Sequence, residues 1–250
     1  MGTLCLTFDN MGRAREIGEG LCGAPDPASP DLATGYPRLL ALLDELDLRG
    51  TFFIEGWNGL HHPDRVQELA ARGHEVGLHG WVHERFSTLD RARAEQVLHD
   101  GTVCFARLGI RPRGFRAPGG LRGEHAIPVL RALGYRYDSS TPSFAEDAGQ
   151  PVMLAPGLAH VPWSPAMVDS IHYLRRAGRP HALEQIWLAA IERIAHSGEV
   201  ATMVMHAYVS AIDEPRFAVV RKVLTHARRR GDIQFTTAGA LAERVLATTN

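Results

Sequence analysis

The repeated alternation of helix and strand patterns constrains the fold of this chain more than any other feature. Leucines at helical spacing in YPRLLALLDELDLRG are followed by Gly50 and then by GTFFIEG, an apolar run typical of a buried strand. The same order recurs until about eight short strands have alternated with helices. This order predicts an α/β fold, and at 250 residues a distorted (β/α) barrel of seven to eight parallel strands. No linker or low-complexity segment divides residues 1–250, so we expect a single domain.

Polar residues follow most of the predicted strands. In a parallel barrel the carboxyl ends of the strands open on one face, where the active site is built. These ends carry Asp9 and Asn10 after the first strand, His79 and His83 after the third, Arg116 after the fourth, Asp138 after the fifth, Trp163 after the sixth and His206 after the seventh. A turn closed by Asx side chains would explain an isolated Asp-Asn pair. Six such strand ends together predict one shared site.

Two histidines in LHGWVH are candidate metal ligands. His79 and His83 are four residues apart, and on one helical turn both imidazoles would lie on the same side, within reach of one ion. A surface pair or a pair satisfied by hydrogen bonds is the alternative. With oxygen from Asp9 and Asn10, the two nitrogens make an open three-ligand set that suits catalytic zinc or a similar divalent ion.

Arg116 and His206 are candidates for further roles in this site. A guanidinium group is costly to hold near a barrel mouth without an acidic partner, so we expect Arg116 to pair with Asp9. His206 ends the apolar strand ATMVMH and is either a capped core histidine or a proton donor, since its ordinary pKa lies near neutrality.

Composition excludes some partners. Lys plus Arg number 27 against 28 for Asp plus Glu, a formal charge of −1 that gives no reason to expect nucleic acid or an anionic membrane. Three cysteines without metal-type spacing predict no disulfide framework and fit a reducing cytoplasm. Neither a leader nor an apolar run of membrane-spanning length is visible, so we expect a cytoplasmic protein. The sequence leaves open whether it forms a homo-oligomer.

The segments TFDN, HGWVH, RAP, YDSS and MVMH, in this order, resemble the five motifs of the polysaccharide deacetylase family, also called the NodB homology family or carbohydrate esterase family 4. The resemblance runs from Leu4 to about Val245 and includes GTFFIEG and RGHEVGLHG. VPWSPAMVDSIHY and the closing segments look more like the branch with allantoinase-like and intracellular deacetylases.

The resemblance implies a NodB-type barrel and metal-assisted hydrolysis of an N-acyl group. By matching position it implies Asp9 as general base, His79 and His83 as metal ligands, Arg116 as the residue that orients Asp9, His206 as general acid, the Gly119 N–H as oxyanion donor and Asp138 as a residue that tunes His206. The tryptophan often found just beyond the fourth motif is missing here, which leaves the role of Asp138 the least defined.

Asn10 departs from the family pattern. The family usually has a second aspartate there, which is a metal ligand. Asparagine can ligate through its carbonyl oxygen, but it removes one negative charge, which weakens divalent-ion binding and leaves the ion more Lewis acidic. The implied cofactor is a divalent metal ion, with Zn²⁺ as first choice and Co²⁺, Ni²⁺ and Mn²⁺ as alternatives.

The expected substrate is a small intracellular N-acylated molecule, such as an acylated amino sugar. A cyclic-amide or ureide hydrolase of the allantoinase-like type, which works without tightly bound metal, and a non-catalytic carbohydrate-binding barrel remain alternatives. Trp163, with His172 and Tyr173, is a candidate aromatic wall for a sugar ring. The Gly- and Pro-rich stretches 11–36 and 139–182 are candidate binding loops.

Overall fold

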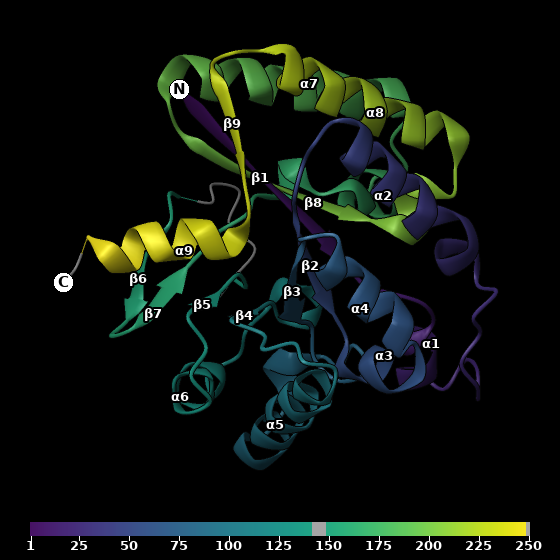
Figure 1. The fold of residues 1–250 in the computed structure, drawn as a ribbon, viewed down its shortest axis with the longest axis vertical. Coiled ribbons are helices and arrows are strands. Elements are labelled where there is room, and N and C mark those ends of the chain that lie inside the picture. Colours follow the sequence, from purple (N-terminus) through teal and green to yellow (C-terminus); the bar gives the residue numbers. More distant parts are fainter. Residues whose placement is uncertain (142–148, 249–250) are drawn as a thin grey trace.

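A curled sheet occupies the centre of the molecule, and the helices lie around its outside (Figure 1). The computed structural model describes residues 1–141 and 149–248. Within them the sheet has nine strands in the order β6-β7-β5-β4-β3-β2-β1-β8, with β9 paired to β1. The strands are β1 (Gly2–Asp9), β2 (Thr51–Ile54), β3 (Glu75–Leu78), β4 (Gly114–Phe115), β5 (Tyr137–Asp138), β6 (Val152–Ala155), β7 (Leu158–His160), β8 (Val200–His206) and β9 (Ile233–Thr236).

The sheet confirms the predicted α/β class with mostly parallel strands, and it differs in two details. Strands β6 and β7 pair antiparallel, because the chain reverses at a turn where Gly157 has a φ of 77°. The path also ends at β6 and β8 without closing, so the sheet is a curled, open barrel among the described residues. An isolated parallel bridge joins Val168 to Val204 of β8 at this open side.

The helices lie in the connections between the strands and after β9, and three of them begin at a side-chain cap. They are α1 (Ala14–Gly18), α2 (Tyr36–Glu45), α3 (Gly56–His61), α4 (Pro63–Ala71), α5 (Arg91–Arg107), α6 (Ala126–Ala132), α7 (Pro180–Ser197), α8 (Glu214–Arg229) and α9 (Ala238–Ala247). Asp90, Asp213 and Thr237 cap α5, α8 and α9 by accepting a hydrogen bond from a backbone N–H in the first turn. In the described part of the chain, no helix has both the length and the hydropathy needed to cross a membrane.

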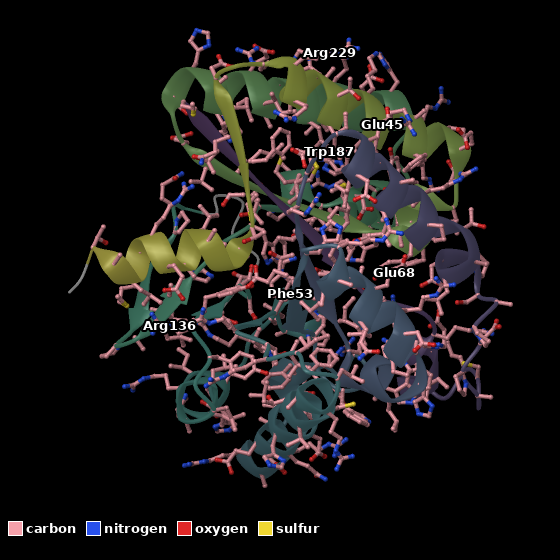
Figure 2. All side chains as sticks on the ribbon, viewed as in Figure 1. Glu45, Phe53, Glu68, Arg136, Trp187 and Arg229 are labelled. Atoms are coloured by element: carbon pink, nitrogen blue, oxygen red, sulfur yellow. The ribbon has the colours of Figure 1, made fainter. Side chains whose placement is uncertain are left out.

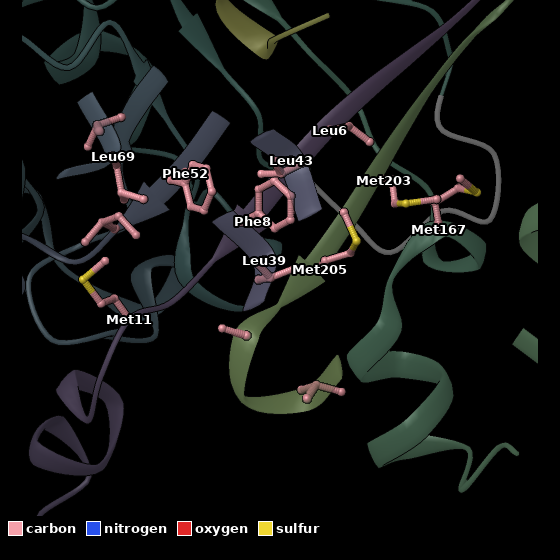
Figure 3. Packing of buried hydrophobic residues seen from close by; sticks show 14 of the residues in the cluster. Leu6, Phe8, Met11, Leu39, Leu43, Phe52, Leu69, Met167, Met203 and Met205 are labelled. Atoms are coloured by element: carbon pink, nitrogen blue, oxygen red, sulfur yellow. The ribbon is translucent and has the colours of Figure 1, made fainter. Parts of the chain in front are cut away.

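The two faces of strand β1 have different neighbours, and this difference brings Asp9 to the site. Leu4, Leu6 and Phe8 belong to the large core under the helices, and the Phe8 ring stacks on Phe52 with centroids 4.5 Å apart (Figure 3). The alternate residues face the inside of the curled sheet, where Cys5 packs with Phe53, a ring near the middle of the molecule (Figure 2). The same two-residue period brings Asp9 to the inner face at the carboxyl end of β1.

Candidate active site

A cavity of about 300 Å³ lies at the carboxyl ends of the strands. The structure brings nearly all the predicted site residues to its wall: Asp9, Asn10, His79, His83, Arg116, Gly119, Trp163 and His206. Both candidate binding loops contribute as well, through Arg15 from residues 11–36 and through Ile171 and Leu174 from residues 139–182. Of the second loop, residues 142–148 lie outside the described part of the chain.

Asp9 and Arg116 form a buried ion pair. The guanidinium is 1% exposed, and its Nη1 donates to Asp9 Oδ1 at 2.7 Å and to Thr7 Oγ1 at 2.9 Å. Its other nitrogens donate to the carbonyl and the hydroxyl of Ser139, and it lies 4.3 Å from the centre of the Phe53 ring. The expected pairing is present, and Asp9 is held in one orientation at the cavity wall.

His79 and His83 lie together, but not on a helical turn as expected. The segment after β3 is a loop in which Gly80 and His83 have positive φ angles of 74° and 67°, and Glu84 holds it by accepting from the N–H groups of Trp81 and Val82. The two imidazole centroids are nevertheless 5.2 Å apart. The i, i+4 rule applies only to helices. His79 and His83 were correctly predicted to be neighbours, but the segment that holds them is a loop and not a helix.

The protonation of both imidazoles suits metal binding. His79 Nδ1 lies 2.8 Å from the Arg116 carbonyl oxygen, which can only accept, so Nδ1 carries the proton and the Nε2 lone pair is available. Burial lowers the pKa of His79 and of His83 to about 3, which keeps both rings neutral at neutral pH.

His206 is oriented by Asp169, a residue that sequence reasoning did not select. Asp169 is fully buried; its Oδ1 lies 2.6 Å from His206 Nδ1, and its Oδ2 accepts from the His206 backbone N–H at 2.9 Å. Burial alone would lower the pKa of His206, but the charge and hydrogen bond of Asp169 raise it above its usual value. Asp169 therefore fixes the His206 ring at the cavity wall and favours its protonated form.

The predicted role of Asp138 is wrong. Asp138 accepts from Arg122 Nη1 at 3.0 Å and from Ser140 Oγ at 2.6 Å, and it does not line the cavity. Arg122 and Ser140 occupy the Asp138 carboxylate, and Asp169 is the acid next to His206. Asp169 reaches His206 because the Val168–Val204 bridge lays its segment along β8.

Asn10 is held by a second residue that sequence reasoning missed. Its Nδ2 donates to Glu55 Oε1 at 2.6 Å. Glu55 directly follows β2 and is fully buried, which raises its pKa to about 8 against the lowering effect of its hydrogen bonds. The signal was present in GTFFIEG, where an acid ends an apolar strand as Asp9 does.

The aromatic wall is smaller than expected. Trp163 lines the cavity and donates from Nε1 to the Ser139 carbonyl at 2.9 Å. His172 and Tyr173 are buried away from the cavity: the His172 ring contacts the Ala166 carbonyl, and the Tyr173 ring lies under the Arg216 guanidinium. Gly119 lies in the wall with a φ of 70°, a conformation that glycine adopts without strain.

The cavity offers a limited donor set for a divalent ion. No group of three or more His, Cys, Asp or Glu side chains that could hold a metal occurs in residues 1–141 and 149–248. The neutral, neighbouring imidazoles of His79 and His83 and the amide of Asn10 do offer two nitrogens and one oxygen, which fits an open site of modest affinity.

Acid, imidazole and guanidinium groups that converge at the carboxyl ends of a curled parallel sheet are typical of enzyme active sites. The model of one family, Polysaccharide deacetylase, matches residues 2–137 of this sequence. This match covers more than half of the chain, and the chain belongs to that family. The resemblance seen in the five motifs is thereby confirmed.

Individual relatives agree with this assignment. The peptidoglycan deacetylase of Helicobacter pylori is 23% identical over 261 residues, which cover 89% of this chain and 88% of the relative. Other curated relatives, named as peptidoglycan or chitin deacetylases or as similar to them, match over shorter stretches, and the chain spans about a third to a half of their length. The expected enzyme class, an amide deacetylase, agrees with these names.

Two solved structures share the fold. A Mycobacterium smegmatis protein assigned to the polysaccharide deacetylases superposes with a TM-score of 0.83 at 25% identity, covering 99% of this chain and 91% of that one. The PuuE allantoinase has a TM-score of 0.84 at 18% identity, covering 98% and 90%. The NodB-type deacetylase fold predicted from the sequence is confirmed.

Proposed function

We propose that this chain is a metal-dependent deacylase that removes an N-acyl group, first of all N-acetyl, from an amino sugar or a related small molecule. The observation that carries the proposal is that one cavity brings together the Asp9–Arg116 pair, two neutral imidazoles and the His206–Asp169 pair. Zn²⁺ is the proposed ion, with Co²⁺, Ni²⁺ and Mn²⁺ as alternatives, and His79, His83 and Asn10 are the residues that would hold it.

Each side chain then has a task in amide hydrolysis. The ion supplies Lewis acidity toward the amide carbonyl and lowers the pKa of water at the site. Asp9, held by Arg116, accepts the proton of the attacking water. The Gly119 backbone N–H would stabilise negative charge on the carbonyl oxygen, and His206 would protonate the leaving amine. Trp163 offers an apolar surface to a sugar ring.

A ureide or cyclic-amide hydrolase is the second candidate, and Asn10 favours it. The amide contributes no charge, so the ligand set is less negative than one with a carboxylate at this position, and a reaction that needs no tightly bound ion is compatible with it. Both candidates use Asp9 as base, and they differ in their dependence on metal.

The test is hydrolysis by the purified chain with and without metal. We expect acetate release from N-acetylglucosamine or its oligomers in the presence of Zn²⁺, loss of activity after treatment with a chelator, and recovery when Zn²⁺, Co²⁺, Ni²⁺ or Mn²⁺ is added back. Allantoin hydrolysis that survives the chelator would favour the second candidate. Absence of turnover of every amide and ureide, with each metal, would overturn both and favour a binding protein.

Asp169→Asn should move the alkaline limb of the kcat/KM profile to lower pH. As general acid His206 must be protonated, so activity falls as the pH rises through its pKa. The Asp169 charge raises that pKa, and its loss leaves burial, which lowers it. Asp138→Asn is the control, because Asp138 contacts Arg122 and not His206. If the alkaline limb of the profile is unchanged in Asp169→Asn, a group other than His206 sets the pKa of that limb.

A further inference from the structure

Glu55 is a buried carboxyl group surrounded by N–H donors. It is fully buried directly after β2, where its Oε1 accepts from Asn10 Nδ2 at 2.6 Å. Its Oε2 accepts from the Met11 backbone N–H at 3.2 Å and from Asn58 Nδ2 at 2.9 Å. All three partners donate, so Glu55 acts toward each of them as an acceptor.

Asn10 is fixed at both its backbone and its side chain. Its backbone N–H donates to the Phe53 carbonyl at 3.2 Å, and its own carbonyl accepts from the Tyr36 hydroxyl. Its φ of 66° lies in the left-handed region, which asparagine tolerates better than most residues. With the backbone held in this way, the side-chain torsions of Asn10 set the direction of its amide.

Glu55 decides that direction. Glu55 accepts from Met11 and Asn58 through Oε2 and from Asn10 Nδ2 through Oε1, so the Asn10 amide nitrogen faces Glu55 and its oxygen points away. Asn10 stands between two cavities: Glu55 lines one of them, while His79 and His83 line the other. No hydrogen bond to Asn10 Oδ1 is found within the part of the chain that the structure describes.

We propose that Glu55 is a positioning residue that turns the Asn10 carbonyl oxygen toward His79 and His83, where it serves as the oxygen ligand of a divalent cation. The inference rests on the metal dependence of the proposed function. It also explains why an amide is tolerated at position 10. An aspartate there would place a carboxylate oxygen 2.6 Å from Glu55 Oε1, and one of the two carboxyl groups would have to keep a proton between them.

The test is a double-mutant cycle on Zn²⁺ affinity, measured by calorimetry or by competition with a chromogenic chelator. Glu55→Gln offers Asn10 both an amide oxygen and an amide nitrogen, so the Asn10 amide loses its fixed direction, and Zn²⁺ affinity should fall about 10- to 100-fold. In an Asn10→Asp background the sign should reverse. There the introduced glutamine can donate to the introduced carboxylate, and Glu55→Gln should raise Zn²⁺ affinity.

A merely structural role for Glu55 would lower affinity, or leave it unchanged, in both backgrounds. Glu75→Gln is the matched control, because Glu75 also accepts from three donors, Thr51, Tyr137 and the Gly239 N–H, at the opposite end of the sheet. It should leave Zn²⁺ affinity unchanged. Thermal unfolding in chelator, read for every variant, checks that each one folds.

The outcomes separate this inference from the proposed function. Wild-type protein that binds Zn²⁺ and hydrolyses amides, while Glu55→Gln binds Zn²⁺ equally well, would overturn the inference and leave the function standing. Wild-type protein that neither binds metal nor turns over an amide would overturn both. A sign reversal between the wild-type background and the Asn10→Asp background would support the positioning role.

Discussion

Replacing His206 by alanine should lower kcat for amide hydrolysis by about 10²- to 10⁴-fold, the usual contribution of a positioned general acid. The imidazole lies in the cavity wall, and Asp169 occupies its Nδ1, so Nε2 is the nitrogen left to face a substrate. Because His206 is not among the proposed metal ligands, Zn²⁺ affinity should change little. The expected signature is therefore a large loss of kcat in protein that still binds the ion.

The fold should tolerate this replacement, because Asp169 keeps other partners. Its carboxylate also accepts from the Ser210 hydroxyl at 2.6 Å and from the backbone N–H groups of Ser170 and of position 206. His99→Ala is the control, since His99 is exposed on α5 and makes only a surface contact with Asp100. If His206→Ala keeps wild-type kcat, the proton donor is another group, and the role proposed for His206 is lost.

The fold was predictable because its signals are local and repeated. Several helices of the outer layer have an apolar face at helical spacing, three begin at a side-chain cap, and β1 is an apolar strand that ends on an acid. The open side of the barrel was not predictable. Strands β6 and β7, of four and three residues, form a hairpin. Sequence patterns as short as these do not distinguish an antiparallel pair of strands from a parallel one.

The Asp9–Arg116 pair was predictable from one rule of physical chemistry together with the matched motifs. A buried guanidinium needs an acid, and among the strand-end acids the motifs assigned Asp9, although β1 and β4 are not neighbours in the sheet. His206 also needs an acid to orient it, but here the rule had several solutions. Asp138 ends a strand, whereas Asp169 lies in an irregular segment whose position next to β8 depends on long-range packing. Sequence spacing carries no information on such a contact.

Replacing Arg116 by methionine should give the largest loss of stability, about 3 to 5 kcal/mol in the free energy of unfolding. The guanidinium is 1% exposed and donates to Asp9, and its loss leaves that carboxylate buried and unpaired at 6% exposure. Chemical denaturation at neutral pH, with two-state analysis, measures the change. A loss below about 1 kcal/mol would show that water or another cation takes over the pairing.

The double variant Asp9→Asn with Arg116→Met decides whether the lost stability comes from the charge or from packing. If an unpaired carboxylate is the cause, removing it should restore part of the free energy, and the double variant should be more stable than Arg116→Met alone. If the contact with Phe53 is the cause, the two losses should add. Arg116→Lys keeps the charge but loses the planar guanidinium that reaches both Asp9 and Ser139. Its free energy of unfolding should therefore lie between those of wild type and Arg116→Met. Recovery in the double variant would show that the unpaired Asp9 carboxylate, and not the lost contact with Phe53, causes the loss of stability.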